Sequence, residues 1–257
     1  MASTAPSHDQ PVMAVTGGAS GIGLATAGLW VERGGRVVLL DVNPVSLETA
    51  TAQLGPAARG VLTDVTVRAS VDAAFESIGE VEGRLDALVC CAGNARPAPS
   101  ATMSDDDWDS LLQVHLSGTM RCCRAGYPLL VASDQASIVT ISSVGGLMGM
   151  PQRANYTTVK SGLNGLTRTL AVEWAKDGIR VNSVGPGYVA GAWIEKLVAE
   201  GSLNKAPIEA RIPLGRFAAA REIAEVICFL SSPLASFVTG ATWMADGGMT
   251  VAGDWYE

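Results

Sequence analysis

The chain has 257 residues, of which 48% are hydrophobic and 17% are charged, and its formal net charge is -7. This length can enclose one large core, so a single domain is expected rather than two small ones. The acidic balance leaves no basic surface that could neutralise a phosphate backbone, and nucleic acid is therefore not an expected partner.

The chain begins with small and polar residues that show no periodicity, so we expect a loose tail at 1–10 and one domain over 11–257. The start has no signal-peptide pattern, and no apolar run approaches the roughly 18 residues of a membrane span. We therefore expect a cytoplasmic protein without a membrane partner. The five cysteines lack the spacing of a zinc site and are expected to be free thiols, with no bound metal.

Segments typical of strands and of helices alternate along the chain. In chain order they are strand 11–16, helix 24–33, strand 36–41, helix 46–54, strand 60–64, helix 70–82, strand 85–92, helix 105–131, strand 137–142, helix 156–176, strand 180–184, helix 220–231 and strand 241–244. Such regular alternation implies parallel pairing through right-handed crossovers. The sequence therefore predicts the α/β class, with a doubly wound parallel sheet flanked by helices.

The turn between the first strand and the first helix is rich in glycine and reads TGGASGIG over residues 16–23. A turn at this place presents free backbone N–H groups to a pyrophosphate, and side chains would block that approach. The alternative is a glycine cluster that only lets a strand and a helix pack closely. The residues expected to hold a dinucleotide are Gly17, Ser20, Gly21, Ile22 and Gly23.

Asp41 closes the second predicted strand, 18 residues after Gly23. A carboxylate at this place accepts hydrogen bonds from the adenosine ribose and repels a 2′-phosphate, so NAD is expected rather than NADP. A solvated aspartate at a strand end is the alternative, but it leaves the glycine turn and the spacing unconnected. Asp64 and Val65 follow the third strand and are expected to edge the adenine pocket.

Tyr156 and Lys160 lie four residues apart in a predicted helix, so their side chains share one face. Proton exchange with an alcohol requires the tyrosine pKa of about 10 to be lowered by positive charge, which lysine and an oxidised nicotinamide supply. Tyr156 is therefore the candidate general acid/base, although this spacing also arises by chance on surface helices. Ser143 follows a strand end and can bond the substrate oxygen, with Ser142 as the competing assignment.

Together these motifs resemble those of the short-chain dehydrogenase/reductase family over nearly the full chain. The segment 16–23 is similar to the family's Thr-Gly-x-x-x-Gly-x-Gly turn, YTTVK at 156–160 to its Tyr-x-x-x-Lys, and Ser143 has the family's spacing. Ala92-Gly93, RVN at 180–182, Pro186-Gly187 and DGG at 246–248 match as well.

The resemblance implies a Rossmann-type fold and an oxidoreductase that interconverts a secondary alcohol and its ketone by hydride transfer. It further implies that Lys160 and Tyr156 also contact the cofactor and that the enzyme is a homotetramer. The remaining residues that it places at the cofactor are Cys91, Ala92, Gly93, Pro186, Gly187 and Val189.

The sequence departs from the family pattern at three places. Cys90-Cys91 stands where Asn-Asn is usual, Gly191 replaces a frequent threonine, and His115 stands where an asparagine completes a proton relay. A neutral imidazole offers one donor and one acceptor and titrates near a pKa of about 6.5, so we expect His115 to serve as a catalytic relay residue. A satisfied core histidine is the alternative.

The regular alternation lapses between residues 191 and 211, and we expect a substrate lid near 190–213. The substrate of the protein is expected to be a small alcohol or ketone. Two other functions share the cofactor motif: a methyltransferase, which does not need the Ser-Tyr-Lys set, and a non-catalytic NAD(H)-binding sensor or scaffold. The candidate pocket residues are Arg96, Gln152, Tyr188 and Trp193.

Overall fold

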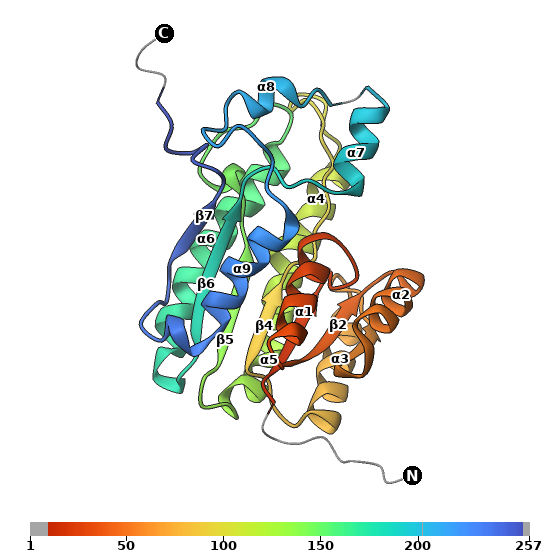
Figure 1. Ribbon diagram of the computed structural model, residues 1–257, viewed down its shortest axis with the longest axis vertical. Helices are drawn as coiled ribbons and strands as arrows, with labels where there is room; N and C mark the ends of the chain where they lie inside the picture. Colours follow the sequence, from red (N-terminus) through yellow and green to blue (C-terminus); the bar gives the residue numbers. More distant parts are fainter. Residues whose placement is uncertain (1–9, 202, 254–257) are drawn as a thin grey trace.

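A parallel sheet forms the centre of the molecule, and the computed structural model describes it within residues 10–201 and 203–253 (Figure 1). In this part of the chain the sheet has seven strands in the order β3-β2-β1-β4-β5-β6-β7, all paired in parallel. The strands are β1 (Val12–Thr16), β2 (Arg36–Asp41), β3 (Ala58–Leu62), β4 (Ala87–Cys90), β5 (Ser137–Ile141), β6 (Arg180–Pro186) and β7 (Thr242–Ala245). The predicted doubly wound α/β fold is confirmed.

Helices cover both faces of this sheet (Figure 1). They are α1 (Gly21–Glu32), α2 (Pro44–Leu54), α3 (Arg68–Val81), α4 (Asp105–Leu111), α5 (Gly118–Val131), α6 (Ala154–Trp174), α7 (Ala192–Ala199), α8 (Ala206–Glu209) and α9 (Ala220–Ser231). Among the described residues, no helix has both the length and the apolar character needed to cross a membrane. The tail predicted at 1–10 lies, except for Gln10, outside the described residues.

The apolar strands have two buried faces because successive side chains point to opposite sides of the sheet. Met13 and Val15 of β1 pack with α1, α2 and α9, whereas Val12 and Ala14 pack with α3, α5 and α6. This double burial explains why the strands read as continuous hydrophobic runs. It also leaves the carboxyl ends of the strands at one edge, where open parallel sheets bind their ligands.

Several predicted boundaries differ from the structure, and three of these differences bear on the ends of the strands and on the site. Helix α1 begins at Gly21, inside the glycine-rich turn, and β3 ends at Leu62, so Asp64 lies in the loop beyond the strand. The helix predicted at 105–131 is divided by a π-helical segment, Leu112–Ser117, between α4 and α5. Such widened turns occur often at functional sites, and this one carries His115.

Candidate active site

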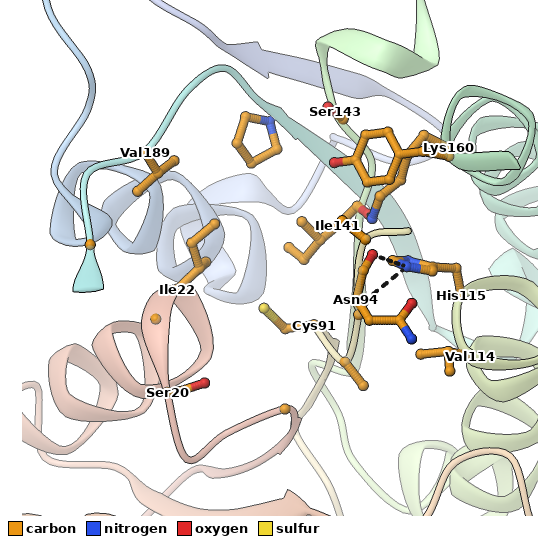
Figure 2. A pocket seen from close by; sticks show the side chains of 18 of the residues that line it. Ser20, Ile22, Cys91, Asn94, Val114, His115, Ile141, Ser143, Lys160 and Val189 are labelled. Carbon is orange, nitrogen blue, oxygen red and sulfur yellow. Dashed lines mark hydrogen bonds between the residues drawn. The ribbon is translucent and has the colours of Figure 1, made fainter. Parts of the chain in front are cut away.

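A cavity of about 1020 Å³ lies along the carboxyl ends of the central strands. Its wall combines residues that follow β1, β2, β3, β4, β5 and β6 with residues of α6 (Figure 2). The predicted site residues that line it are Gly17, Ser20, Gly21, Ile22, Asp41, Asp64, Val65, Cys91, Ala92, Gly93, His115, Ser143, Tyr156, Lys160, Pro186, Gly187 and Val189. Residues from the segments after six strands therefore meet at one place.

The glycine-rich turn is shaped by close backbone contacts. Gly17 has a φ of +63°, and a Cβ there would lie 2.9 Å from the Cα of Ala92. Gly23, which is also predicted to hold the cofactor, is not among the residues that line the cavity. A Cβ on Gly23 would lie 2.2 Å from the carbonyl oxygen of Gly17, so this glycine lets α1 pack against the turn. Gly21, by contrast, faces open space at the cavity.

Asp41 holds its carboxylate rigidly at one end of the cavity. Its Oδ2 accepts a hydrogen bond from the backbone N–H of Ala19 at 3.1 Å, and its Oδ1 accepts one from Asn43 at 3.0 Å. Asp64, nearby in the wall, accepts bonds from the N–H and the hydroxyl of Thr66. The cations that line the described cavity are Lys160 and Arg153, and both belong to the end that holds Tyr156. The end that holds Asp41 therefore carries only negative charge.

The other end of the cavity brings Ser143, Tyr156 and Lys160 together. Lys160 is buried and donates a hydrogen bond from Nζ to the carbonyl of Ile141 at 2.7 Å, with Nζ 5.5 Å from the Tyr156 ring centre. The hydroxyl of Ser143 lies beside the Tyr156 phenol. Ser142 instead donates its hydroxyl to the carbonyl of Lys160 at 3.1 Å, so the structure favours Ser143 over Ser142 as the substrate-facing serine.

Burial controls the protonation of this group. It raises the pKa of Tyr156, and the Ser143 hydroxyl and the Arg153 guanidinium only partly oppose it. It also lowers the pKa of Lys160 to about 8. The net shift in the Tyr156 pKa is therefore upward for the protein alone, because burial costs the phenolate more hydration than the nearby charges return. The expected lowering, which includes the charge of an oxidised nicotinamide, stays a prediction.

Known proteins are similar to this chain over nearly its whole length. A family model described as enoyl-(acyl carrier protein) reductase matches residues 17–250. The chain is 38% identical over 246 residues to D-threitol dehydrogenase of Mycolicibacterium smegmatis, covering 95% of this chain and 94% of that protein. It is 40% identical over 242 residues to cis-4-hydroxycyclohexanecarboxylate dehydrogenase of Sinomonas cyclohexanicum, with 93% and 96% covered.

The crystal structure of gox2181 superposes with a TM-score of 0.90 at 36% identity and covers 95% of this chain and 97% of that one. The chain belongs to the short-chain dehydrogenase/reductase family. Its relatives are named dehydrogenases and reductases, and the chain is an oxidoreductase that acts on CH–OH groups, as predicted. This membership excludes the methyltransferase alternative and lends no support to a non-catalytic sensor.

His115, which replaces the family's relay asparagine, contacts the backbone of Asn94. Its Nε2 lies 3.0 Å from the carbonyl oxygen and 3.2 Å from the nitrogen of Asn94 (Figure 2). Within the described residues Nδ1 is buried without a hydrogen-bond partner. Burial, aided by the charge of Lys160, lowers the His115 pKa to about 3. The imidazole is thus neutral at physiological pH, which corrects the expectation that it titrates there.

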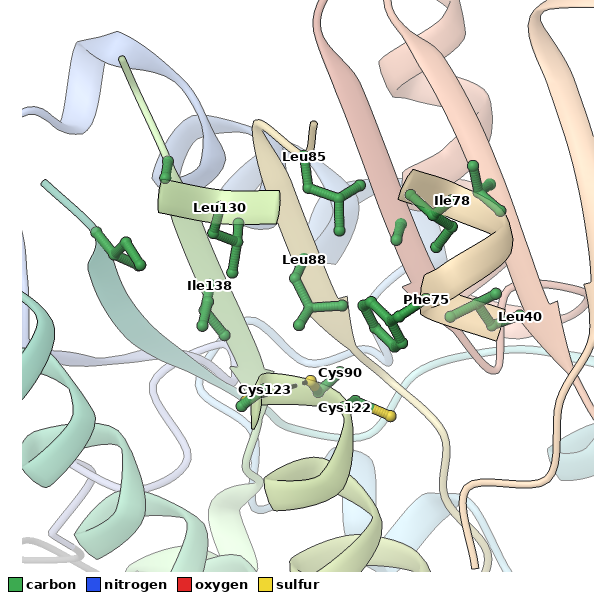
Figure 3. Packing of buried hydrophobic residues seen from close by; sticks show 14 of the residues in the cluster. Leu40, Phe75, Ile78, Leu85, Leu88, Cys90, Cys122, Cys123, Leu130 and Ile138 are labelled. Carbon is green, nitrogen blue, oxygen red and sulfur yellow. Dashed lines mark hydrogen bonds between the residues drawn. The ribbon is translucent and has the colours of Figure 1, made fainter. Parts of the chain in front are cut away.

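The cysteine pair that replaces the family's Asn-Asn divides between the core and the cavity. Cys90 packs in the core with its Sγ 4.0 Å from that of Cys123, next to Cys122 (Figure 3). Cys91 faces the cavity, where burial raises its pKa to about 11. The Thr16 hydroxyl accepts bonds from the N–H groups of Cys91 and Ala92, both at 3.1 Å, and so braces β4 against β1.

The residues on the substrate side of the cavity differ from the four candidate pocket residues predicted from the sequence. Tyr188 lines the cavity, but Arg96 does not and forms an ion pair with Asp107 at 3.1 Å. Gln152 is also absent from the cavity wall, and the side chain of Trp193 lies outside the described part of the structure. Arg153 lines the cavity as well, although it is not among the residues predicted from the sequence. Its position one helical turn before Tyr156 is the signal that could have identified it.

Proposed function

We propose that this protein is an NAD(H)-dependent dehydrogenase/reductase that interconverts a secondary alcohol and its ketone. The observation that carries this proposal is the convergence of Ser143, Tyr156 and Lys160 at one end of a cavity whose other end holds Asp41. Two relatives named as dehydrogenases, for D-threitol and for cis-4-hydroxycyclohexanecarboxylate, support this reaction. A bound nicotinamide supplies or accepts the hydride in such chemistry.

The residues present fit a dinucleotide. The cradle formed by Gly17 and Gly21 leaves the backbone open at the start of α1, where a helix N-terminus stabilises phosphate charge. Asp41 has lone pairs for the ribose hydroxyls, and no lysine or arginine lines this end of the described cavity to pair with a 2′-phosphate. Both features support NAD over NADP.

The three polar residues divide the proton chemistry between them. The Tyr156 phenol donates a proton to the ketone oxygen in reduction and accepts one from the alcohol in oxidation. The Ser143 hydroxyl binds that same oxygen and orients it toward the phenol. The Lys160 ammonium favours the phenolate whenever Tyr156 has lost its proton, because an opposite charge stabilises the ionised form.

Nicotinamide absorbance tests the reaction on a panel of secondary alcohols and ketones, with Tyr156→Phe as the decisive variant. We expect turnover to fall by about two orders of magnitude or more while NADH affinity, measured by fluorescence, stays within a few-fold. Tyr127→Phe is the matched control, because Tyr127 bonds Asp177 outside the cavity. Turnover of Tyr156→Phe within a few-fold of wild type would assign the proton transfer to another residue.

Residues 190–213 are proposed as a lid over the substrate. Helices α7 and α8 lie in this segment, at the top of the view in Figure 1. Ile194 of α7 lines the cavity. Ile194 also packs with Ile212 and Phe217, so the segment has a small apolar core of its own. A lid of this kind excludes water from the hydride-transfer step.

Assembly as a homotetramer is supported by apolar residues near the open edge of the sheet. Strand β7 is the last strand of the sheet, and its Trp243 is 39% exposed. Phe237, just before it, is 104% exposed, and Leu234 and Val251 are also exposed. A second copy of the chain would remove this apolar surface from water.

The free cysteines support the placement of this protein in a reducing compartment, the cytoplasm.

A further inference from the structure

Arg153 places a positive charge in the catalytic end of the cavity without a partner of its own. It immediately precedes α6, three residues before Tyr156, and it lines the cavity. Within the described residues no carboxylate oxygen lies within 4.0 Å of its guanidinium, and no hydrogen bond from the guanidinium is present. Arg96, which lies outside the cavity, is by contrast paired with Asp107.

The other charged groups of the cavity leave this charge uncompensated. Both aspartates in the wall, Asp41 and Asp64, belong to the adenosine end. His115 is neutral because its pKa is lowered to about 3, and Lys160 is a second cation. Arg153 also acts on the reacting centre, since its charge opposes the rise in the Tyr156 pKa. A chain with a net charge of -7 thus keeps its catalytic cavity positive.

We propose that the substrate is a hydroxy acid or its oxo acid and that Arg153 binds the carboxylate. This inference rests on the proposed function and names its substrate class. A guanidinium pairs with a carboxylate through two parallel hydrogen bonds, which also orients the molecule. The carbinol then lies at Ser143 and Tyr156, and the carbon chain contacts the apolar side chains of Met150 and Ile194 in the wall.

The reaction leaves the carboxylate unchanged. In oxidation the C–H bond of the carbinol breaks, its two electrons and hydrogen pass as hydride to the oxidised nicotinamide, and the hydroxyl proton passes to Tyr156. The carbinol carbon is oxidised to a carbonyl and the nicotinamide is reduced. Arg153 acts in this step as a specificity residue that holds the far end of the substrate.

Matched substrates test the proposal. The probes are 3-hydroxybutyrate, mandelate and 3-hydroxycyclohexanecarboxylate, each assayed with NAD beside its methyl ester and its primary amide. We expect wild-type kcat/KM to favour at least one acid over its ester and amide by about 10- to 100-fold. Arg153→Gln should remove that preference, mostly through KM, because the acid loses its ion pair while the ester and the amide lose only the effect of the charge on Tyr156. Arg153→Lys should retain part of it because the charge remains.

Arg168→Gln is the matched control, because Arg168 is an exposed arginine of α6, the helix that Arg153 precedes, and does not line the cavity. It should behave as wild type. Quenching of bound NADH fluorescence by cyclohexanecarboxylate measures carboxylate binding without turnover and should weaken in Arg153→Gln alone.

Two outcomes would overturn the inference while the proposed function stands. One is wild-type preference for the esters or amides. The other is an equal loss for acid and ester in Arg153→Gln with a shifted pH profile, which would make Arg153 a residue that only tunes Tyr156. If NADH does not bind, and neither the hydroxy acids nor the alcohols without a carboxylate are oxidised, the proposed function itself fails and the inference fails with it.

Discussion

Replacing His115 with asparagine should make the protein less sensitive to acid, because burial holds this imidazole neutral. Its pKa is about 3 in the folded chain, against 6.5 for an exposed histidine. Between these values the unfolded chain binds a proton that the folded chain does not. The pKa is lowered on folding, so the stability is fully present above pH 6.5 and is lost as the pH falls below it.

The size of the effect follows from the two pKa values. Each pH unit below 6.5 costs about 1.4 kcal/mol, so the free energy of unfolding should drop by about 2 to 3 kcal/mol between pH 7 and pH 4.5 through His115 alone. Asparagine does not titrate in this range. The variant should therefore gain about 2 to 3 kcal/mol relative to wild type over the same interval.

Urea unfolding followed by tryptophan fluorescence, at one protein concentration and at several pH values, measures this difference. The carboxylates titrate in both proteins, so their contribution cancels when the two curves are subtracted. A difference that stays constant within about 0.5 kcal/mol from pH 7 to pH 4.5 would refute the reasoning. It would mean that His115 becomes protonated in the folded chain as readily as in water.

Activity completes the experiment. Asparagine can still bond the backbone of Asn94, whereas leucine leaves these backbone groups unbonded at a cost of about 1–3 kcal/mol and loosens the loop beside the cofactor cavity. His115→Asn should keep substantial activity, and His115→Leu should lose much of it while remaining folded. Equal activity of the two variants at matched thermal stability would make His115 a packing residue.

Two further predictions concern the cofactor and the assembly. Asp41→Ala should narrow the preference for NAD over NADP, compared as kcat/KM, by about 10- to 100-fold, because it removes the ribose contacts and the repulsion of a 2′-phosphate. Wild-type rates with NADP that equal those with NAD would contradict the cofactor assignment. Phe237→Asp should weaken assembly in light scattering without lowering the melting temperature of the protomer, because this ring is fully exposed in the protomer. A monomeric wild type at micromolar concentration would contradict the tetramer.

Local features of the sequence were sufficient to predict most of the fold. The strands are continuous apolar runs because both faces of a parallel sheet are buried, and this pattern is visible without tertiary structure. The glycine-rich turn and the four-residue spacing of Tyr156 and Lys160 are local as well. Helix geometry alone places these two side chains on one face, and the structure brings both to the cavity.

The chemistry of individual side chains depended instead on residues far away in the chain. Gly23 looks like a cofactor glycine, yet its neighbour is the Gly17 carbonyl. Ser142 and Ser143 are adjacent and identical, and only the position of α6 against β5 separates them. The sequence shows their residue types but not which of their groups is already bonded to the backbone.

The charged residues also differ in ways that depend on contacts between distant segments. Nothing in the sequence distinguishes the arginines Arg96 and Arg153. In the structure Arg96 forms an ion pair with Asp107 of α4, whereas Arg153 lines the cavity and has no acidic partner among the described residues. The sequence by itself determined the family fold, the glycine-rich turn and the Ser-Tyr-Lys set, because these depend on local spacing and periodicity. Only the tertiary structure decided that His115 is neutral and that Arg153 has no ion-pair partner among the described residues, because burial and ion pairing are set by contacts between segments distant in the chain.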